Sequence, residues 1–438
     1  MANETTNIFE EFKEELNISQ IDADSVLTAI DEKIIWYGKR INNPKYKAIV
    51  PIKTKALKEL RAKVLESPNC IEEYIASLIL GVESPQMNVY GISFGTTYSS
   101  IAYIDERGRA NSIEIDSSME MPSVVAFDDY GSAFVGDEAK EMLRYEYRNV
   151  CAYIKEQLGN RDFRFRANNE EYTPEFITAL ILKKLVEKAK KASKNDSNDV
   201  VLTFPAYFGI EQKQSLITAA KISGINVVNT ISEPLALAIA FSEHLSIPQT
   251  ILIYDLGGAT LDITIIRIDG KNINIVTSDG FKKLGGGSWD LPVIRYVINT
   301  YCSQYGESES NIMHDDDTMA NMVQDVELAK KKLSHSETTY VKLYSQKIEI
   351  TRDMFEQLTL ELLERTIMKV REVIEIAFPN DKLIDKIILA GGASLMPQVK
   401  NRIVQEYPNI PVEFYNSNMT IAKGAAIYGS NINRNYNI

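Results

Sequence analysis

Two short stretches of the chain repeat a pattern of glycine, threonine and acidic or hydroxyl residues that suits an anionic ligand. The first is Gly91-Ile92-Ser93-Phe94-Gly95-Thr96-Thr97-Tyr98-Ser99, and the second is Tyr254-Asp255-Leu256-Gly257-Gly258-Ala259-Thr260-Leu261-Asp262. In each stretch an extended segment enters a glycine turn and another leaves it. Glycine permits close backbone approach, threonine adds hydroxyl donors, and successive N–H groups in such a turn form a concave anion site. Two such turns predict a clamp that holds one polyphosphate from both sides.

Each turn taken alone is more simply interpreted as an ordinary glycine hairpin. The ordered series of motifs between and after the two turns reverses that preference. One motif follows a buried-strand pattern, one places a carboxylate at a helix start, and the others are glycine-rich or carry lysines on one helix. They are Pro205-Ala206-Tyr207-Phe208, Ile231-Ser232-Glu233-Pro234-Leu235-Ala236, Gly285-Gly286-Gly287, Glu327-Leu328-Ala329-Lys330-Lys331-Lys332-Leu333-Ser334 and Gly391-Gly392-Ala393-Ser394.

Composition limits the class of protein. The chain has 438 residues, 45% of them hydrophobic, which is enough for two to four domain-sized units with sizeable cores. Its net charge of −12 argues against nonspecific nucleic-acid binding, because phosphate contacts need a surplus of basic residues. Cys70, Cys151 and Cys302 lack metal-ligand spacing, which disfavours a disulfide scaffold or zinc site and favours the cytoplasm. Neither a secretory signal nor an apolar run of membrane-spanning length is visible, so no membrane association is expected.

The chain changes character near residue 88. Residues 1–88 are charged and have helical patterning at residues 55–61 and 71–80, which predicts a helical N-terminal extension. From Val89 onward, buried-strand patterns alternate with helical ones, as in the strand expected at residues 200–204, the helix at 211–223 and the strand at 386–390 followed by a helix at 397–406. Such alternation predicts an α/β fold. Asp315-Asp316-Asp317 is expected to cap a helix, with a metal site as the less favoured alternative.

The ordered motifs resemble the nucleotide-binding domain of the seventy-kilodalton heat-shock chaperones, the DnaK-type family, within the actin-like ATPase superfamily. The resemblance covers Val89 to Gly429. It implies two lobes, each with a central mixed sheet and flanking helices, closing over Mg-ATP or ADP. Lobe I would comprise residues 89–247 completed by 415–430, lobe II residues 248–414, and residues 431–438 would form a polar tail. The helices that begin at Glu233 and around Ala422 would cross near the hinge.

The resemblance also implies roles at the phosphate end of the site. Lys155 matches the family's catalytic lysine, although an ordinary surface lysine is the simpler interpretation of that residue alone. Asp255 would hold magnesium through its water shell, and Glu233 and Asp262 would orient water or metal from further out. The phosphates would be held by Gly95, Thr96, Thr97 and Tyr98 on one side and by Gly257, Gly258, Thr260, Gly285, Gly286 and Gly287 on the other.

The adenosine end is implied by a helix and a late glycine pair. Glu327, Lys330, Lys331 and Ser334 have i, i+3, i+4 and i+7 spacing and therefore share one helix face. A structural helix with solvated lysines is the alternative for this group. From the other side, the resemblance implies contacts from Gly391, Gly392, Ala393 and Leu395.

Three positions depart from the family pattern. Ser93 stands where the family has an aspartate that shares magnesium's water shell, Ala259 replaces a glycine of the second turn, and Leu395 replaces an arginine that packs on adenine. The first departure matters most, because phosphoryl transfer depends on positioning and electrostatic stabilisation largely through the metal. The expected result is ATP binding that survives and hydrolysis slower than is usual for the family.

The sequence therefore favours an ATP-binding switch with slow magnesium-dependent hydrolysis. A non-hydrolysing nucleotide-binding interaction protein is the main alternative, and a filament-forming or sugar-kinase relative is disfavoured. A complete chaperone of the resembled family continues into a peptide-binding β-sandwich, but only a short polar segment follows Gly429 here. We therefore expect a relative without a peptide-binding domain, with a truncated chain as the alternative. The N-terminal extension is a candidate surface for a protein partner. Packing of the extension on the main body is the interpretation that we favour.

Overall fold

The computed structural model describes residues 23–39, positions 54, 57, 58, 61, 62, 64 and 65, and residues 89–105, 107–242, 247–270, 272–379 and 384–430. The chain separates into two compact units, residues 1–87 and 88–438. In the first unit, helix α2 spans Ala23–Gly38, and Asp31 on this helix pairs with Arg61 at 2.6 Å. The helical character expected of the extension is thus confirmed for α2. The helix expected at residues 71–80 lies outside the described residues.

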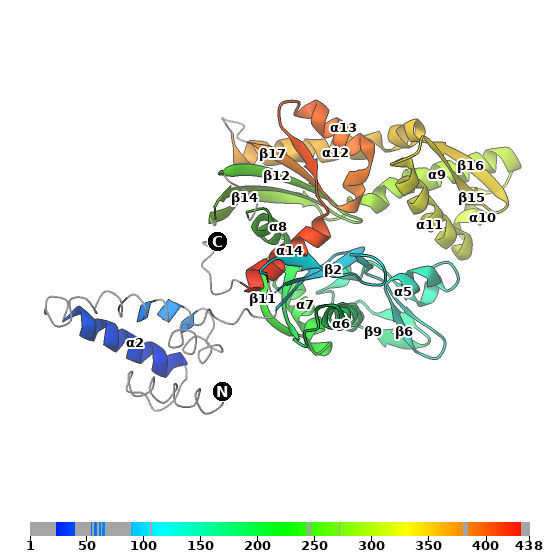
Figure 1. Cartoon of the computed structure of the whole chain (residues 1–438). Helices are drawn as coiled ribbons and strands as arrows, with labels where there is room; N and C mark the ends of the chain where they lie inside the picture. The colour runs from blue at the N-terminus through cyan, green and yellow to red at the C-terminus, as the bar shows by residue number, and fades with distance from the viewer. Residues whose placement is uncertain are drawn as a thin grey trace. The chain divides into compact units, whose positions relative to one another are not determined.

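The first part of the second unit is built on one mixed sheet, and Figure 1 shows it as the lower layer of this unit. Its strand order is β11-β10-β1-β2-β3, with β4 also paired to β2. β1 pairs parallel to β10 and antiparallel to β2. The strands are β1 (Tyr90–Phe94), β2 (Tyr98–Ile104), β3 (Ala110–Ser112), β4 (Met121–Pro122), β10 (Asp199–Phe204) and β11 (Asn226–Ser232).

Smaller elements and two long helices complete this part of the unit. A three-stranded sheet has the order β6-β5-β7, β8 pairs with β9, and α6 packs against α7. The elements are β5 (Val125–Phe127), β6 (Ala133–Val135), α5 (Asp137–Met142), η2 (Tyr147–Asn149), β7 (Val150–Cys151), η3 (Ile154–Gln157), β8 (Phe165–Ala167), β9 (Glu170–Tyr172), α6 (Pro174–Ser193) and α7 (Ile210–Ile222).

A second mixed sheet, of order β14-β13-β12-β17-β18, carries the later part of the unit. β12 pairs antiparallel to β13 and parallel to β17, so it is central and its residues 250–254 are all buried. The strands are β12 (Gln249–Leu256), β13 (Leu261–Asp269), β14 (Asn272–Phe281), β17 (Lys386–Ala390) and β18 (Val412–Phe414).

Helices and a hairpin surround this second sheet. Asp315 is the N-cap of α11, where its side chain accepts a hydrogen bond from the N–H of Thr318, as the capping interpretation expected. The elements are α9 (Gly286–Tyr305), α10 (Glu309–Met313), α11 (Asp316–Leu333), β15 (Thr338–Leu343), β16 (Gln346–Thr351), α12 (Arg352–Ala377), η4 (Gly392–Leu395) and α13 (Pro397–Glu406).

Two crossing helices join the halves of the unit. They are α8 (Glu233–Ser242) and α14 (Ser417–Ser430), and Figure 1 shows them between the two sheets. α14 packs on β1 and β2 of the first sheet, whereas α8 contacts β10 and β11 as well as β13 and β14. At the crossing, a Cβ placed on Gly424 would lie 1.8 Å from the carbonyl oxygen of Ala236. Only glycine lets the two helix backbones approach this closely.

Each sheet has its own hydrophobic core. The first core gathers Ile92, Phe94 and Ile101 against α6, and the second gathers Leu252, Tyr254 and Trp289 against α12. The α/β fold of two lobes is therefore confirmed, while the residue boundaries given above for the lobes stay a prediction. In the described segments, no helix combines the length and apolar character needed to span a membrane.

Candidate nucleotide site

The first glycine turn connects β1 to β2 and is held through its carbonyl groups. Ser123 donates its Oγ hydrogen to the carbonyl of Gly95 at 2.8 Å and its N–H to the carbonyl of Thr97 at 2.9 Å. With those acceptors engaged, the N–H groups of Thr96 and Thr97 make no hydrogen bond to another described residue. The turn thus presents unpaired donors, which is the requirement for binding an anion.

The second glycine turn connects β12 to β13 and is held in a similar way. The N–H groups of Gly286 and Gly287, at the start of α9, donate to the carbonyls of Gly257 and Gly258 at 2.9 Å each. Gly257 in turn donates to the carbonyl of Thr260 at 3.0 Å. Gly285–Gly287, here called the third glycine run, therefore positions the second turn rather than forming a separate loop.

The two turns lie directly against each other. A Cβ placed on Gly258 would come within 2.3 Å of Cγ2 of Thr97, and one on Gly285 would come within 2.4 Å of the backbone nitrogen of Ala259. The neighbour of Gly285 is backbone, so packing requires glycine there, whereas a side chain at Gly258 would force the side chain of Thr97 to shift. The two turns expected to form a clamp therefore meet, and their binding of a polyphosphate stays a prediction.

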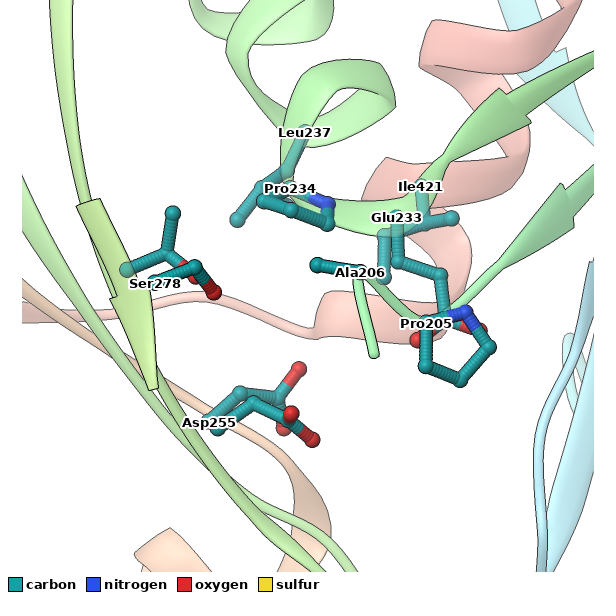
Figure 2. Close-up of a pocket in the computed structure, with 10 residues that line it drawn as sticks. Pro205, Ala206, Glu233, Pro234, Leu237, Asp255, Ser278 and Ile421 are labelled. Carbon is teal, nitrogen blue, oxygen red and sulfur yellow. The ribbon is translucent and has the colours of Figure 1, made fainter. Parts of the chain in front are cut away.

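Three carboxylates and one lysine gather beside the clamp. Asp255 and Asp262 lie opposite each other in the β12–β13 register, and Glu233 begins α8. Nζ of Lys155 lies 2.7 Å from Oε1 of Glu233, and the lysine side chain is buried. A cavity of about 20 Å³, enough for one water molecule, is lined by all three carboxylate residues. Figure 2 shows Asp255 and Ser278 on strands at one side of this cavity and Glu233 and Pro234 at the other.

Burial makes the two strand aspartates, Asp255 and Asp262, weaker acids than usual. Removal from solvent raises the pKa of Asp255 to about 8 and the pKa of Asp262 to about 7, and the charge of Glu233 adds to both shifts. The charge of Lys155 acts in the opposite direction on both. Two carboxyl groups that hold their protons near neutral pH form a site where a bound cation would favour ionisation.

A raised carboxyl pKa predicts a pH-dependent gain in stability from Asp255→Asn. The folded pKa of about 8 exceeds the ordinary value of 3.8, so the folded state binds more protons across that window and this group's contribution to stability falls as pH rises through it. In the nucleotide-free protein, we expect Asp255→Asn to raise the free energy of unfolding by at least about 1 kcal/mol more at pH 8.5 than at pH 5, because the loss begins above the ordinary pKa of 3.8 and grows until the folded pKa is reached. Urea unfolding at the two pH values measures this difference.

The control for this prediction is Asp269→Asn, because Asp269 is an exposed aspartate on the same strand as Asp262. It should change stability little at either pH. Equal destabilisation of the Asp255→Asn protein at both pH values would contradict the prediction.

Lys155 is positioned by a short helical turn whose flanking residues have positive φ angles. It lies in η3, whose N-cap Tyr153 has φ +58°, a conformation uncommon for a residue with a side chain. Gly159 follows with φ +82°, and a Cβ there would lie 3.1 Å from the backbone nitrogen of Gln212 on α7. Nζ of Lys155 also lies 5.9 Å from the centre of the Phe208 ring. These constraints direct the lysine inward toward Glu233, unlike a surface lysine.

The lysines of α11 have different surroundings. Lys330 is buried and donates to the carbonyl of Gly286 at 2.7 Å, and it pairs with Asp290 on α9 at 2.7 Å. Lys331 is half-exposed and pairs with Glu327 at 2.5 Å. Lys330 thus reaches the third glycine run, whereas Lys331 lies 3.4 Å from the hydroxyl of Tyr98 in the first turn and Glu327 lies 3.8 Å from Lys140. Ser334 is the C-cap of α11, where its N–H donates to the carbonyl of Lys331, and its place in this group stays a prediction.

The late glycine pair, Gly391 and Gly392, follows the end of β17 and lies against Asp255. Gly391 has φ +81°, and a Cβ on it would lie 2.5 Å from Oδ1 of Asp255. The next turn, η4, begins at Gly392 and brings Ala393 to the third glycine run, where a Cβ on Gly286 would lie 3.3 Å from that of Ala393. Leu395 ends η4 with 53% of its side chain exposed. An exposed leucine beside the site can offer an adenine base apolar contact but no cation–π interaction.

Several residues of the site were not predicted from the sequence to belong to it. Asp290 follows the third glycine run by three residues and neutralises Lys330, and the hydroxyl of Ser417 accepts a hydrogen bond from the N–H of Gly391 at 3.1 Å. Lys140 on α5 donates to the hydroxyl of Tyr98 at 2.9 Å. Pro205 and Ala206 line the cavity beside Asp255. Only the Pro205 motif carried a sequence signal, because the other three act through contacts between distant segments.

Two of the departures from the family pattern, Ser93 and Ala259, lie in closely packed parts of the site. Ser93 is buried in β1, on the side of the sheet where a Cβ on Gly91 would lie 2.2 Å from the backbone of α14. Ala259 lies where the backbone of Gly285 packs closely on the second turn. The acidic groups of the site therefore come from β12, β13 and α8, and the first turn contributes none.

The site suits a magnesium-bound nucleotide. Unpaired N–H groups at the first turn match phosphate oxygens, and three carboxylates with a lysine match the charges of a cation and a phosphate. In the described residues, no three His, Cys, Asp or Glu side chains form a ready metal-ligand cluster. When bound, magnesium would supply charge neutralisation at the phosphates.

Two mixed sheets bridged by crossing helices, with a pair of glycine hairpins meeting between them, define the actin-like class of ATPase folds. Comparison with known proteins narrows this class. The sequence model of the Hsp70 protein family matches residues 89–164 and 162–435. The chain belongs to the Hsp70 family.

Individual relatives are chaperone proteins DnaK from three organisms. The chain is 31% identical over 351 residues to that of Halobacterium salinarum, covering 78% of this chain and 55% of the relative. It is 33% identical over 352 residues to that of Thermotoga neapolitana, with 77% and 58% covered. It is 30% identical over 353 residues to that of Mycoplasma mobile, with 78% and 58% covered. The chain thus matches little more than half the length of these curated relatives.

Proposed function

We propose that the protein binds ATP and ADP with magnesium and acts as a nucleotide-dependent conformational switch that hydrolyses ATP slowly. The observation that carries this proposal is the direct contact between the two glycine turns, with Gly258 against Thr97. Membership in the Hsp70 family supports a nucleotide-binding, chaperone-like protein. The crossing of α8 and α14 supports a switch, because it joins two sheets that have separate cores.

Each site residue has a role in this proposal. Gly95, Thr96, Thr97 and Tyr98 bind the phosphates from one side, and the second turn, held in place by Gly285–Gly287, binds them from the other. Lys155 positions the attacking water and offsets charge on the γ-phosphate, while Glu233 holds the lysine through their 2.7 Å pair. Glu327, Lys330 and Lys331 contact the nucleoside from α11, opposite Gly391, Gly392, Ala393 and Leu395. Ser334, at the end of the same helix, is the fourth member of this group.

Calorimetric titration tests the binding proposal. The full chain should bind ATP and ADP in the presence of magnesium, with GTP as a test of base selectivity. Because Leu395 offers the base only apolar contact, we expect the preference for adenine to be weaker than the affinity for the phosphates. Absence of binding by all three nucleotides would overturn the proposal.

A non-hydrolysing nucleotide-binding protein is the second candidate, and Ser93 is the observation that favours it. This buried serine leaves the first turn without an acid. Single-turnover hydrolysis with magnesium separates the candidates. A rate equal to that in buffer would support the second candidate.

Restoring the acid predicts a gain of activity. Ser93→Asp should increase single-turnover hydrolysis by roughly 10- to 100-fold, the usual value of an outer-shell partner of a metal. Ser93→Asn is the matched control, because it has nearly the same shape without the charge, and it should not increase the rate. Equal rates for the parent and the Ser93→Asp variant would show that another departure, such as Ala259, limits hydrolysis.

The cytoplasm is the proposed compartment, supported by the cysteine usage of the sequence. Cys151 and Cys302 are free thiols, and burial raises the pKa of Cys151 to about 12, which makes it unreactive. A protein partner that reads the nucleotide state is part of the proposal. Its docking on residues 1–88 remains a prediction from sequence.

A further inference from the structure

The hairpin of β15 and β16 has an edge that is separate from the nucleotide site. The two strands pair antiparallel from Thr338↔Thr351 to Leu343↔Gln346 and form a sheet of two strands only. β16 therefore has no strand on its other side within the described part of the chain. Strands left in this way expose backbone donors and acceptors.

The alternation of bonded and non-bonded pairs along the hairpin identifies which backbone N–H and C=O groups of β16 are free. The N–H of Arg352 donates to the carbonyl of Glu337 at 2.8 Å, which continues the ladder by one pair beyond β16. Because bonded and non-bonded pairs alternate in an antiparallel ladder, Lys347 and Glu349 direct their N–H and C=O groups away from β15. Neither residue makes a further backbone hydrogen bond within the described ranges.

A groove runs beside this edge. It has a volume of about 240 Å³. One wall is β16 with Lys347 and Glu349, and the other is a stripe on α9 spaced four residues apart, Tyr296, Thr300 and Gln304. Met354 of α12 closes it. The lining is mixed: Tyr296, Ile348 and Met354 offer apolar contact to a side chain in the groove, and Thr300, Gln304 and Thr351 are polar.

We propose that this groove binds an extended peptide segment of a partner protein, which adds to β16 as an antiparallel strand. In that arrangement the free N–H and C=O groups of Lys347 and Glu349 would pair with the peptide backbone. A strand residue between these two pairs directs its side chain to the opposite face, toward the groove and α9.

Charge complementarity specifies the peptide. Lys347 and Glu349 are both exposed on the outer face of the strand. An antiparallel partner places an acidic residue opposite Lys347 and a basic residue two positions earlier, opposite Glu349. The segment recognised is therefore lysine, a large apolar residue and glutamate, in that order. Its apolar residue would fill the groove.

A second copy of the chain fits less well than a peptide. β16 itself contains Lys347-Ile348-Glu349, but Ile348 is only 5% exposed and belongs to the core of its own lobe. It cannot also fill a neighbouring groove. A peptide uses both the free edge and the groove, whereas a second copy would use the edge alone.

Fluorescence anisotropy with the full chain tests the proposal. The probe is a labelled peptide Thr-Lys-Leu-Glu-Thr, and the control peptide Thr-Glu-Leu-Lys-Thr has the same composition with the charges exchanged. We expect the first peptide to bind about tenfold more tightly, which corresponds to two cross-strand charge pairs. The double variant Lys347→Glu, Glu349→Lys should reverse this preference without changing the net charge.

Proline variants test the backbone contribution. Lys347→Pro removes a free edge N–H and should weaken binding of the first peptide about tenfold. Lys342→Pro is the matched control, since Lys342 lies opposite Lys347 in the register and its N–H faces the other edge. This control should bind nearly as the parent does. Circular dichroism and thermal unfolding of both variants establish that they are folded.

Three results would overturn the proposal. The first is no binding of either peptide at millimolar concentration. The second is equal binding of both peptides by the parent and by the charge-exchanged variant. The third is a dimer in sedimentation that the Lys347→Pro substitution abolishes, which would assign the edge to a second copy.

Discussion

Replacement of Lys155 by alanine is expected to reduce single-turnover hydrolysis of ATP by at least about 100-fold while nucleotide affinity changes much less. The lysine is buried, and its Nζ atom lies 2.7 Å from Glu233, in the acid group beside the two glycine turns. A group that positions water and offsets developing charge affects the transition state more than the bound ground state. Single-turnover kinetics together with calorimetry separate the two effects.

Lys330→Ala is the matched control for this prediction. Lys330 is also a buried lysine, and its partner Asp290 also lies at 2.7 Å, but we propose that this pair serves the nucleoside end. Both variants break a buried ion pair, so their losses of stability should be similar. Lys330→Ala should weaken nucleotide binding and leave the rate of the bound complex nearly unchanged. Equal rate losses in the two variants would contradict the assignment of Lys155.

The Lys155→Ala variant also carries a readout that a purely structural lysine would not produce. The positive charge of Lys155 lowers the pKa of Asp255 and Asp262, although burial has the larger opposing effect. Without the lysine, both carboxyl groups should hold their protons to higher pH. Magnesium-dependent nucleotide binding should then shift to higher pH, because a bound cation favours the ionised form. An unchanged pH profile would argue against close coupling of these groups.

Gly424→Ala is expected to cause the largest loss of stability. The added Cβ would lie 1.8 Å from the carbonyl oxygen of Ala236, which is backbone and cannot rotate away. Overpacking typically costs about 1–3 kcal/mol, and a clash of two helix backbones belongs at or above the upper end of that range. It outweighs the gain of about 1 kcal/mol that alanine normally brings to a helix. Urea unfolding measures the difference.

Gly429→Ala provides the control on the same helix. A Cβ on Gly429 would meet side-chain atoms of Val89 and Val201 at 2.9 and 3.1 Å, and such atoms can shift. This variant should therefore lose less stability than Gly424→Ala. Because α8 and α14 join the two sheets, Gly424→Ala should also weaken nucleotide binding in the fraction that folds. Full stability in this variant would show that the helices separate at little cost.

The two halves of the clamp are chemically unequal. The second turn follows Asp255 and lies opposite Asp262, whereas the first follows the buried Ser93 and contributes only N–H and hydroxyl donors. Phosphate binding requires donors, whereas hydrolysis also requires acids that organise the metal and water. This asymmetry is the physical basis for expecting nucleotide to be held more reliably than it is cleaved.

Local patterns were enough to predict many elements of the fold. The strand expected at residues 200–204 is β10, the helix expected at 211–223 is α7, and Gly224 follows it with φ +78°. The helix expected at 397–406 is α13, with the same limits. Alternating burial, proline starts and glycine ends are properties of neighbouring residues, so one sequence contains them. The predicted roles of the site residues, by contrast, still await the experiments above.

What the sequence by itself determined about this protein is the order of its elements, its family resemblance and the identity of the glycine turns with their missing acid. The tertiary structure alone decided which groups meet: Gly258 with Thr97, Lys330 with Asp290, and Lys140 with Tyr98. It also decided that one buried lysine faces Glu233 and that β16 keeps a free edge. The physical reason is that burial, ion pairing and close backbone approach depend on distances between segments far apart in the chain, which no local pattern of residue types encodes.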